Sequence, residues 1–231
     1  MDGKVYAVPK NWGTTGMLYD TGKLKNGPTS WKEFWAAAQG PASGRTMVHD
    51  YQLTAIGNAL KSFGYSFNSL DPKELADAEK LLIEVKPHLF AINSDIQPSM
   101  RSGDAWLAMS WTGDASQLHR DNAQMQFELG KEGGELWSDF FAIPKNSEHK
   151  DAAYAFINYL LEPAVIAKVS EYVGYANPNL AAASEMDPEV LNNPSIYPPK
   201  AVMDNLYVST ELPVKIQRAM TRSWTKIKTG K

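Results

Sequence analysis

The feature that most constrains the fold of this chain is the alternation of short apolar runs with amphipathic helical stretches. That order of elements is typical of an α/β protein, in which helices cover a sheet. Residues 4–8, 17–19, 106–111, 125–129 and 136–143 are predicted as strands. Helices are predicted over residues 71–85, after Ser147, from Pro163 to Val173 and after Pro213.

The helix at residues 71–85 has a well-defined start. Asp71 can accept hydrogen bonds from the free amides of the first turn, Pro72 suits the first helical position, and Glu74 can close a capping box. The two helices after Ser147 form a pair that carries an apolar stripe of Ala153, Phe156, Ile157, Leu160 and Leu161. The last helix places Ile216, Met220, Trp224 and Ile227 on one face.

Charge and cysteine content exclude several functional classes. The 231 residues include 23 basic and 26 acidic side chains, and the net charge of −3 argues against a nucleic-acid partner. Because there is no cysteine, disulfides, thiolate metal sites and cysteine nucleophiles are excluded. No apolar run reaches the roughly 18 residues that a transmembrane helix needs, and residues 1–6 do not show the charged and apolar regions of a signal peptide.

Motifs for catalysis are weak throughout the sequence. His49, His88, His119 and His149 lack metal-binding spacing, so each is expected to be a surface or hydrogen-bonded histidine, and no metal or cofactor is predicted. No serine lies in a G-x-S-x-G motif. Two carboxylates in a cleft can cleave a glycosidic bond, which makes Asp114 and Asp139 formal candidates for a hydrolase.

Three short segments combine an aromatic residue with a carboxylate or hydroxyl near an expected strand end: residues 110–114, 136–139 and 173–175. Trp137 and Asp139 differ by two positions on a strand and therefore point to the same side. An acid beside an indole suits an organic ammonium, which donates charge-assisted hydrogen bonds and is attracted to the ring face. The alternative interpretation is that Trp111 and Trp137 are core residues and both aspartates cap turns.

Several motifs, taken together and in order, resemble the polyamine-binding proteins of bacterial ABC importers, and the last of them is similar to the putrescine-binding branch. They lie at residues 6–9, 12–16, 28–31, 63–65, 93–95, 131–134, 155–161, 174–179, 193–199 and 221–228. The resemblance implies a two-lobed fold like that of type II periplasmic binding proteins. It also implies a non-enzymatic, periplasmic protein that closes on an amine such as putrescine or spermidine and delivers it to an inner-membrane permease.

The resemblance also implies a set of ligand-binding residues. Trp111 and Asp114 match a pocket tryptophan and an ammonium-binding aspartate, Trp137 and Asp139 match a pocket aromatic and its characteristic acid, and Tyr175 matches a pocket tyrosine.

A second-lobe helix completes this expected set, but with a departure from the family. Where family members carry a ligand-contacting glutamate, this chain has Thr54, preceded by Asp50 and Tyr51. The missing carboxylate favours a short diamine over a long polyamine. It also leaves open a sugar or an amino-acid derivative as the ligand.

Relative to the family, most of the first lobe is expected to be missing ahead of residue 1. We expect residues 1–22 to be a remnant of that lobe with the first hinge crossing, and residues 23–136 to form lobe two. Residues 137–175 would contain the second crossing and the helical pair of lobe one, and residues 176–231 would return to lobe two. The stripe that includes Phe156 and Ile157 would then lack cover, which predicts self-association or a complementing N-terminal segment.

Overall fold

A 13-residue strand, β1 (Val8–Asp20), organises the fold of the computed structural model, which describes residues 5–230. The other strands are β2 (Thr46–Val48), β3 (Leu89–Ile92), β4 (Leu107–Trp111), β5 (Met125–Glu128) and β6 (Glu135–Phe141). The sheet has the order β3-β2-β4-β1-β5, and β6 pairs with the first half of β1. β1 is antiparallel to β4, β5 and β6, whereas β2 is parallel to β3 and β4.

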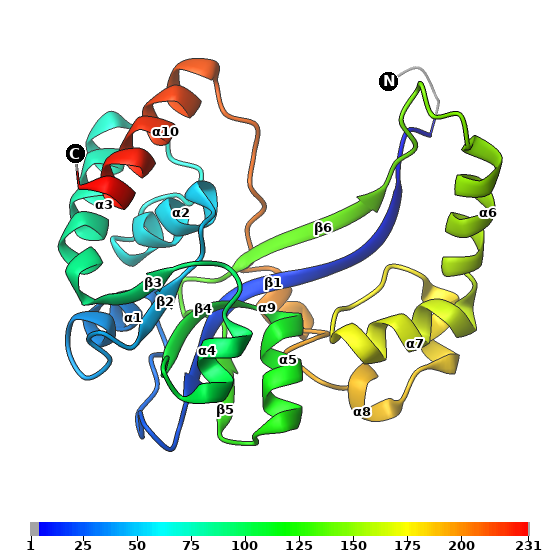
Figure 1. Cartoon of the computed structure of the whole chain (residues 1–231), viewed down its shortest axis with the longest axis horizontal. Helices are drawn as coiled ribbons and strands as arrows, with labels where there is room; N and C mark the ends of the chain where they lie inside the picture. Colours follow the sequence, from blue (N-terminus) through cyan, green and yellow to red (C-terminus); the bar gives the residue numbers. More distant parts are fainter. Residues whose placement is uncertain (1–4, 231) are drawn as a thin grey trace.

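Two helical layers cover the sheet, as Figure 1 shows. The α-helices are α1 (Trp31–Gln39), α2 (Gln52–Ser62), α3 (Pro72–Val85), α4 (Gln97–Ser102), α5 (Thr112–Asp121), α6 (Lys150–Leu160), α7 (Pro163–Val173), α8 (Pro188–Leu191), α9 (Lys200–Met203) and α10 (Val214–Thr229). Short 3-10 helices, η1 (Lys86–His88) and η2 (Leu180–Glu185), complete the described elements.

Alternation along the strands divides the core between the two faces of the sheet. Met17 and Leu107 pack in one cluster with residues of α1, α2, α3 and α10, whereas Leu18 and Ala108 pack in a second cluster with residues of α4 and α5. Successive side chains of a strand point to opposite faces, so two neighbouring apolar residues supply both cores. A strand that is buried on both sides therefore holds the three layers together.

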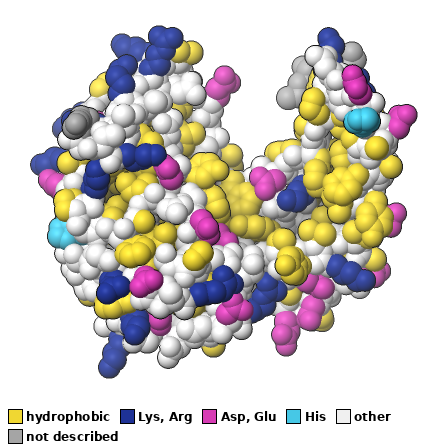
Figure 2. All heavy atoms as spheres, in the orientation of Figure 1, with side chains coloured by type: hydrophobic (Ala, Val, Ile, Leu, Met, Phe, Trp, Pro, Cys, Tyr) yellow, Lys and Arg dark blue, Asp and Glu magenta, His cyan; other side chains and the backbone are white. Residues whose placement is uncertain are grey.

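β1 and β6 continue as a long two-stranded ribbon from the sheet toward α6 and α7, on the right of Figure 1. There α7 forms a small separate core with η2, made of Ile166, Ala167, Ala182 and Met186. Figure 2 shows the molecule hollowed between this part and the larger part that contains the sheet, with hydrophobic side chains on the floor of the hollow.

The α3 prediction is confirmed, apart from the role of Glu74. The carboxylate of Asp71 accepts hydrogen bonds from the amides of Lys73 and Glu74, and Ala78, Leu82 and Val85 are buried. Glu74 does not close a capping box, because its side chain accepts a hydrogen bond from the hydroxyl of Ser69 instead.

The division of the first 20 residues into two strands is wrong. Residues 4–8 are not a strand of their own; Val8 begins β1, which continues without a break to Asp20, and residue 4 lies outside the described residues. The strand continues through both glycines, because Gly13 pairs with Trp137 on β6 and Gly16 pairs with Ser110 on β4. Large rings pack against them: an added Cβ would lie 2.6 Å from the Trp137 ring at Gly13 and 2.6 Å from the Phe127 ring at Gly16.

The apolar stripe of α6 is only partly uncovered. Phe156 is 58% exposed, but Ile157 is buried, which corrects the expectation for that residue. Within residues 5–230 no single helix is long and apolar enough to cross a membrane. Taken together, α6 and α7 have the length and composition of a span, but the two helices are bent by 76° relative to each other.

Candidate ligand-binding cavity

A cavity of about 390 Å³ opens where α2, β4, β6 and the segment after α7 meet. Six of the eight residues expected to bind a ligand line it. The lining consists of Tyr51, Thr54, Trp111, Glu135, Trp137, Asp139 and Tyr175. Segments that are far apart in the sequence thus converge on one cavity.

β6 supplies three of the lining residues through its alternation. Glu135, Trp137 and Asp139 follow one another at every second position, so their side chains share one side of the strand. Glu135 was not among the predicted residues, because the strand was predicted to start at residue 136. The alternation of Trp137 and Asp139 nevertheless pointed to Glu135, which lies two residues before Trp137 and so on the same side of the strand.

Aromatic rings form the walls of the cavity in two edge-to-face pairs. The ring centroids of Trp137 and Tyr175 lie 5.0 Å apart, and those of Tyr51 and Trp111 lie 5.6 Å apart. Gly113 makes room for Tyr175, because a Cβ added there would lie 2.4 Å from the tyrosine ring. The indole nitrogen of Trp137 is buried and has no hydrogen-bond partner among the described residues.

His49 supports one wall from behind. Its ring centroid lies 4.4 Å from that of Trp111, and the side chain is fully buried. Burial lowers the pKa of His49 to about 3, so the imidazole is neutral at physiological pH. The expectation of a surface or hydrogen-bonded histidine is wrong here, because neither ring nitrogen has a hydrogen-bond partner in the described part of the chain.

The two carboxylates that line the cavity have different surroundings. Glu135 is only 6% exposed, and it accepts hydrogen bonds from the hydroxyls of Thr15 (3.1 Å), Thr54 (2.8 Å) and Ser209 (2.8 Å). Asp139 is exposed and accepts a 3.4 Å hydrogen bond from the Asn11 amide. Of the two acids, only Glu135 is buried.

Asp114 is not among the lining residues. It lies in the first turn of α5, where its carboxylate accepts a hydrogen bond from the Gln97 amide. Burial raises the pKa of Asp114, and the nearby charge of Asp95 adds to this effect, whereas the Gln97 hydrogen bond opposes it. Burial also raises the pKa of Tyr175, with smaller contributions from the charges of Asp114 and Asp139, so the Asp114 charge reaches the cavity wall.

Asp50 is also absent from the lining. Its carboxylate accepts a 3.1 Å hydrogen bond from the Trp224 indole and 2.9 Å hydrogen bonds from the Lys228 ammonium. The side chain therefore joins the start of α2 to α10. Only its neighbours Tyr51 and Thr54 line the cavity.

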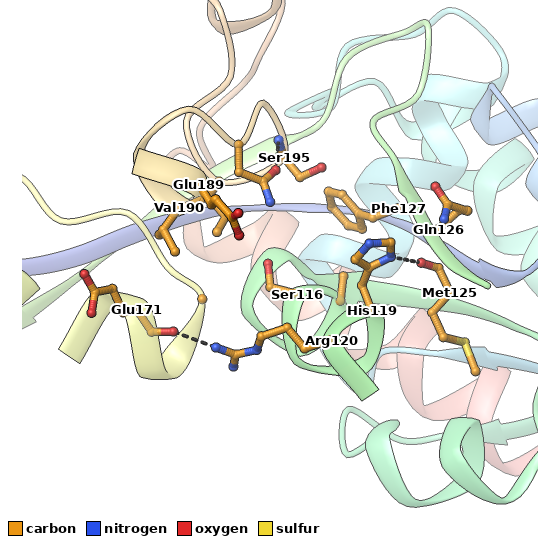
Figure 3. A pocket seen from close by; sticks show the side chains of 14 residues that line it. Ser116, His119, Arg120, Met125, Gln126, Phe127, Glu171, Glu189, Val190 and Ser195 are labelled. Carbon is orange, nitrogen blue, oxygen red and sulfur yellow. Dashed lines mark hydrogen bonds between the residues drawn. The ribbon is translucent and has the colours of Figure 1, made fainter. Parts of the chain in front are cut away.

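A second cavity of about 420 Å³ lies between α5, β5 and the segments after α7, and Figure 3 shows its lining. Its basic groups are occupied within the protein: Arg120 donates to the backbone carbonyls of Glu171 and Tyr172, and His119 donates to that of Met125. None of the residues predicted to bind a ligand lines this cavity.

The chemistry of the first cavity suits a small organic cation. Aromatic walls attract a cation and cover methylene groups, while carboxylates accept the hydrogen bonds of an ammonium. No group of three or more His, Asp or Glu side chains within residues 5–230 is arranged to hold a metal ion.

Comparisons with known proteins point in the same direction. Residues 1–198 match the model of a family described as bacterial extracellular solute-binding protein. A putrescine-binding periplasmic protein of Pseudomonas aeruginosa is 33% identical over 244 residues, covering 99% of this chain and 66% of that protein. A spermidine/putrescine-binding periplasmic protein of Escherichia coli is 36% identical over 204 residues, covering 87% of this chain and 57% of that protein.

The fold has a counterpart among solved structures. The spermidine/putrescine ABC transporter substrate-binding protein of Streptococcus pneumoniae matches with a TM-score of 0.82 at 29% identity, covering 96% of this chain and 68% of that one. The predicted type II periplasmic binding protein fold and the resemblance to polyamine-binding proteins are thereby confirmed. This chain spans less than two thirds of the length of the two curated relatives.

Proposed function

We propose a function from one premise: the chain belongs to the family of bacterial extracellular solute-binding proteins. It is the substrate-binding component of an ABC importer, which captures a small di- or polyamine in the periplasm and delivers it to a membrane permease. One observation carries this proposal: acidic side chains of β6 lie between aromatic walls in a single cavity. The polyamine ligands named for its relatives support the same solute class.

The cavity offers interactions of the size that amine binding requires. Removing an ammonium from water costs several kcal/mol even after relaxation. One ion pair at about 4 Å contributes roughly 4 kcal/mol at an effective dielectric constant near 20. Two such pairs, together with contacts to aromatic faces, support binding in the micromolar range.

Closure of two lobes on the ligand follows from the same proposal. In this assignment, residues 23–136 and 176–231, which contain α1 to α5 and α10, form lobe two. Residues 1–22 and 137–175, which contain α6 and α7, form the crossings and the remnant of lobe one. β1 and β6 connect the two parts, and Trp137, Asp139 and Tyr175 lie on the connecting segments. A ligand held from both sides binds the closed form more tightly and therefore shifts the population toward it.

A neutral sugar or an amino-acid derivative is the nearest alternative ligand, because tryptophan also stacks on sugars. Salt distinguishes the classes: the affinity for a diamine held by carboxylates falls as ionic strength rises, whereas that for a neutral sugar does not. A glycoside hydrolase that uses Asp114 and Asp139 is disfavoured, because Asp114 does not line the cavity with Asp139. We therefore propose binding without catalysis.

The first prediction tests Asp139. We expect Asp139→Asn to weaken putrescine binding by about 2–5 kcal/mol, because closure of the lobes on the ligand would cover Asp139 and leave the ammonium desolvated without its carboxylate partner. Titration calorimetry on the full chain measures this change, and Asp151→Asn, an exposed acid on α6, is the matched control. Unchanged putrescine affinity would remove Asp139 from the site, and no binding of any amine by the wild type would refute the proposed function.

Beyond the ligand and the permease, we propose a contact with another polypeptide. Tyr154, Phe156 and Tyr159 on α6 are each more than half exposed. Figure 2 shows hydrophobic side chains gathered over the part of the surface where α6 and α7 lie. A second copy of this chain or a complementing segment would cover them, since exposed apolar patches of this kind mark interaction sites.

A further inference from the structure

The carboxylate of Glu135 is a buried charge that the protein surrounds with hydroxyl groups but leaves without a counter-ion. No ion pair joins it to a lysine, arginine or histidine within residues 5–230. An ionised carboxylate that is this deeply buried is costly unless a cation compensates it. A bound cation would supply this counter-charge.

The groups that hold Glu135 come from three separate elements. Thr15 lies on β1, Thr54 on α2 and Ser209 on the segment before α10, and each hydroxyl donates to the carboxylate. Neutral donors fix the position of the carboxylate while leaving its negative charge in place. This is a rigid anionic site, in contrast to the exposed Asp139, which has one long hydrogen bond from Asn11.

The spacing of the two acids defines the shape of the cation. Glu135 and Asp139 are four residues apart on one side of β6, which corresponds to about 13 Å along a strand. Both side chains lie on the same side of the strand and line the same cavity, so the two carboxylates approach one ligand from different ends. A single ammonium cannot reach both acids, whereas a linear amine with two cationic groups can, and its methylene chain then passes beside Trp137.

We propose that Glu135 is the second anionic anchor of the cavity and holds the distal cationic group of a linear amine whose first ammonium is bound at Asp139. This proposal rests on the proposed function and refines its ligand class. The Thr54 hydroxyl does not replace a carboxylate in this arrangement, because it orients the carboxylate of Glu135. The cavity therefore accepts a long amine: spermidine and cadaverine bind at least as tightly as putrescine.

Three related amines with one, two and three amino groups test this role. Titration calorimetry compares n-butylamine, putrescine and spermidine on the full wild-type chain and on Glu135→Gln, with Glu128→Gln, an exposed acid on β5, as the control variant. We expect Glu135→Gln to weaken putrescine and spermidine binding by about 30-fold or more, because the distal ammonium loses its partner. The affinity for n-butylamine changes less than about twofold, since that ligand has no second cation.

The outcomes separate this inference from the proposed function. If the wild type binds no amine, both fail. If the wild type binds diamines but Glu135→Gln weakens n-butylamine and putrescine equally, or weakens neither, the role of Glu135 is refuted and the proposed function stands.

A second variant keeps the test decisive if Glu135→Gln does not fold. Glu135→Asp retains the charge but draws the carboxylate back by one methylene, so the preferred diamine becomes longer and the ratio of cadaverine to putrescine affinity rises. A ratio equal to that of the wild type overturns the proposal.

Discussion

At the scale of single residues, burial distinguishes the three acids Glu135, Asp139 and Asp114. Glu135 is held by three hydroxyls, Asp139 faces solvent, and Asp114 is partly buried next to Gln97. Each of the three acids lies within three residues of a tryptophan in the sequence. They nevertheless differ in how deeply they are buried and in which groups donate hydrogen bonds to them. Environment sets the electrostatic cost of each charge and therefore its role.

Asp114 predicts a pH-dependent penalty on stability. Burial raises its pKa in the folded protein above the unfolded value, so folding favours the protonated form. The resulting penalty is absent below the unfolded pKa of about 3.9 and is fully present once the pH exceeds the folded pKa. We expect Asp114→Asn to raise the free energy of unfolding at pH 7, with a gain that shrinks as the pH falls toward about 3.9.

Urea unfolding at several pH values measures this gain, and Asp151→Asn on the exposed surface of α6 serves as the control. A gain that is the same at every pH would contradict the assignment of the burial penalty to Asp114.

At the scale of elements, specific hydrogen bonds hold helices on the sheet. Asp71 caps α3, and Thr112, at the start of α5, exchanges hydrogen bonds with Thr14 on β1. α10 is attached through Asp50, which bonds both Trp224 and Lys228. These contacts place α2 and the start of α5 where Thr54 and Trp111 line the cavity.

Asp50 predicts a contribution to stability rather than to ligand binding. The hydrogen bond from Lys228 lowers the pKa of Asp50 and outweighs the smaller, opposite effect of desolvation. The stabilising effect of the Asp50 carboxylate is therefore present above the unfolded pKa of about 3.9 and is lost as the pH falls through the folded pKa. We expect Asp50→Asn to reduce the free energy of unfolding at pH 7 by about 1 kcal/mol or less, because the pair is partly exposed. Putrescine affinity should stay unchanged.

Denaturant titration and calorimetry measure the two quantities, with Glu84→Gln, which removes the exposed 3.9 Å pair with Lys80, as the control. A large loss of putrescine affinity in Asp50→Asn would place that residue in the site after all.

At the scale of the whole molecule, the two parts differ in how much core each contains. The sheet and its helices enclose two large clusters, whereas α7 and η2 share a small one, and α6 adds little beyond Ile157. The aromatic residues of α6 remain exposed. Surface of this kind favours association, because burial contributes roughly 25 cal/mol per Å² of apolar area.

We expect the isolated chain to self-associate through α6. Light scattering coupled to size-exclusion chromatography should show a mass above 25.6 kDa that rises with concentration. The double variant Phe156→Ser and Tyr159→Ser should shift the population to the monomer, whereas Phe90→Ser, which changes an exposed aromatic on β3, should not. A wild-type monomer at every concentration would contradict self-association and leave a complementing segment as the partner to be tested.

Much of the fold and part of the cavity could be predicted from the sequence, because periodicity and capping are local properties. The α3 cap, the core face of α10 and the shared side of Trp137 and Asp139 all follow from spacing along the chain. The unbroken course of β1 did not follow, because Gly13 lies in the strand through its pairing with Trp137 on β6, which comes from a distant segment.

Local patterns in the chain were therefore enough to predict the α/β order, the family resemblance and most of the residues that line the cavity. Three features became visible only in the folded chain: Asp50 bonds to α10, His49 is buried behind Trp111, and Glu135 is the enclosed acid. The physical reason is that burial and hydrogen-bond partners depend on which distant segments meet. The three hydroxyls around Glu135 lie 120, 81 and 74 residues away along the chain, and no local pattern encodes such a meeting.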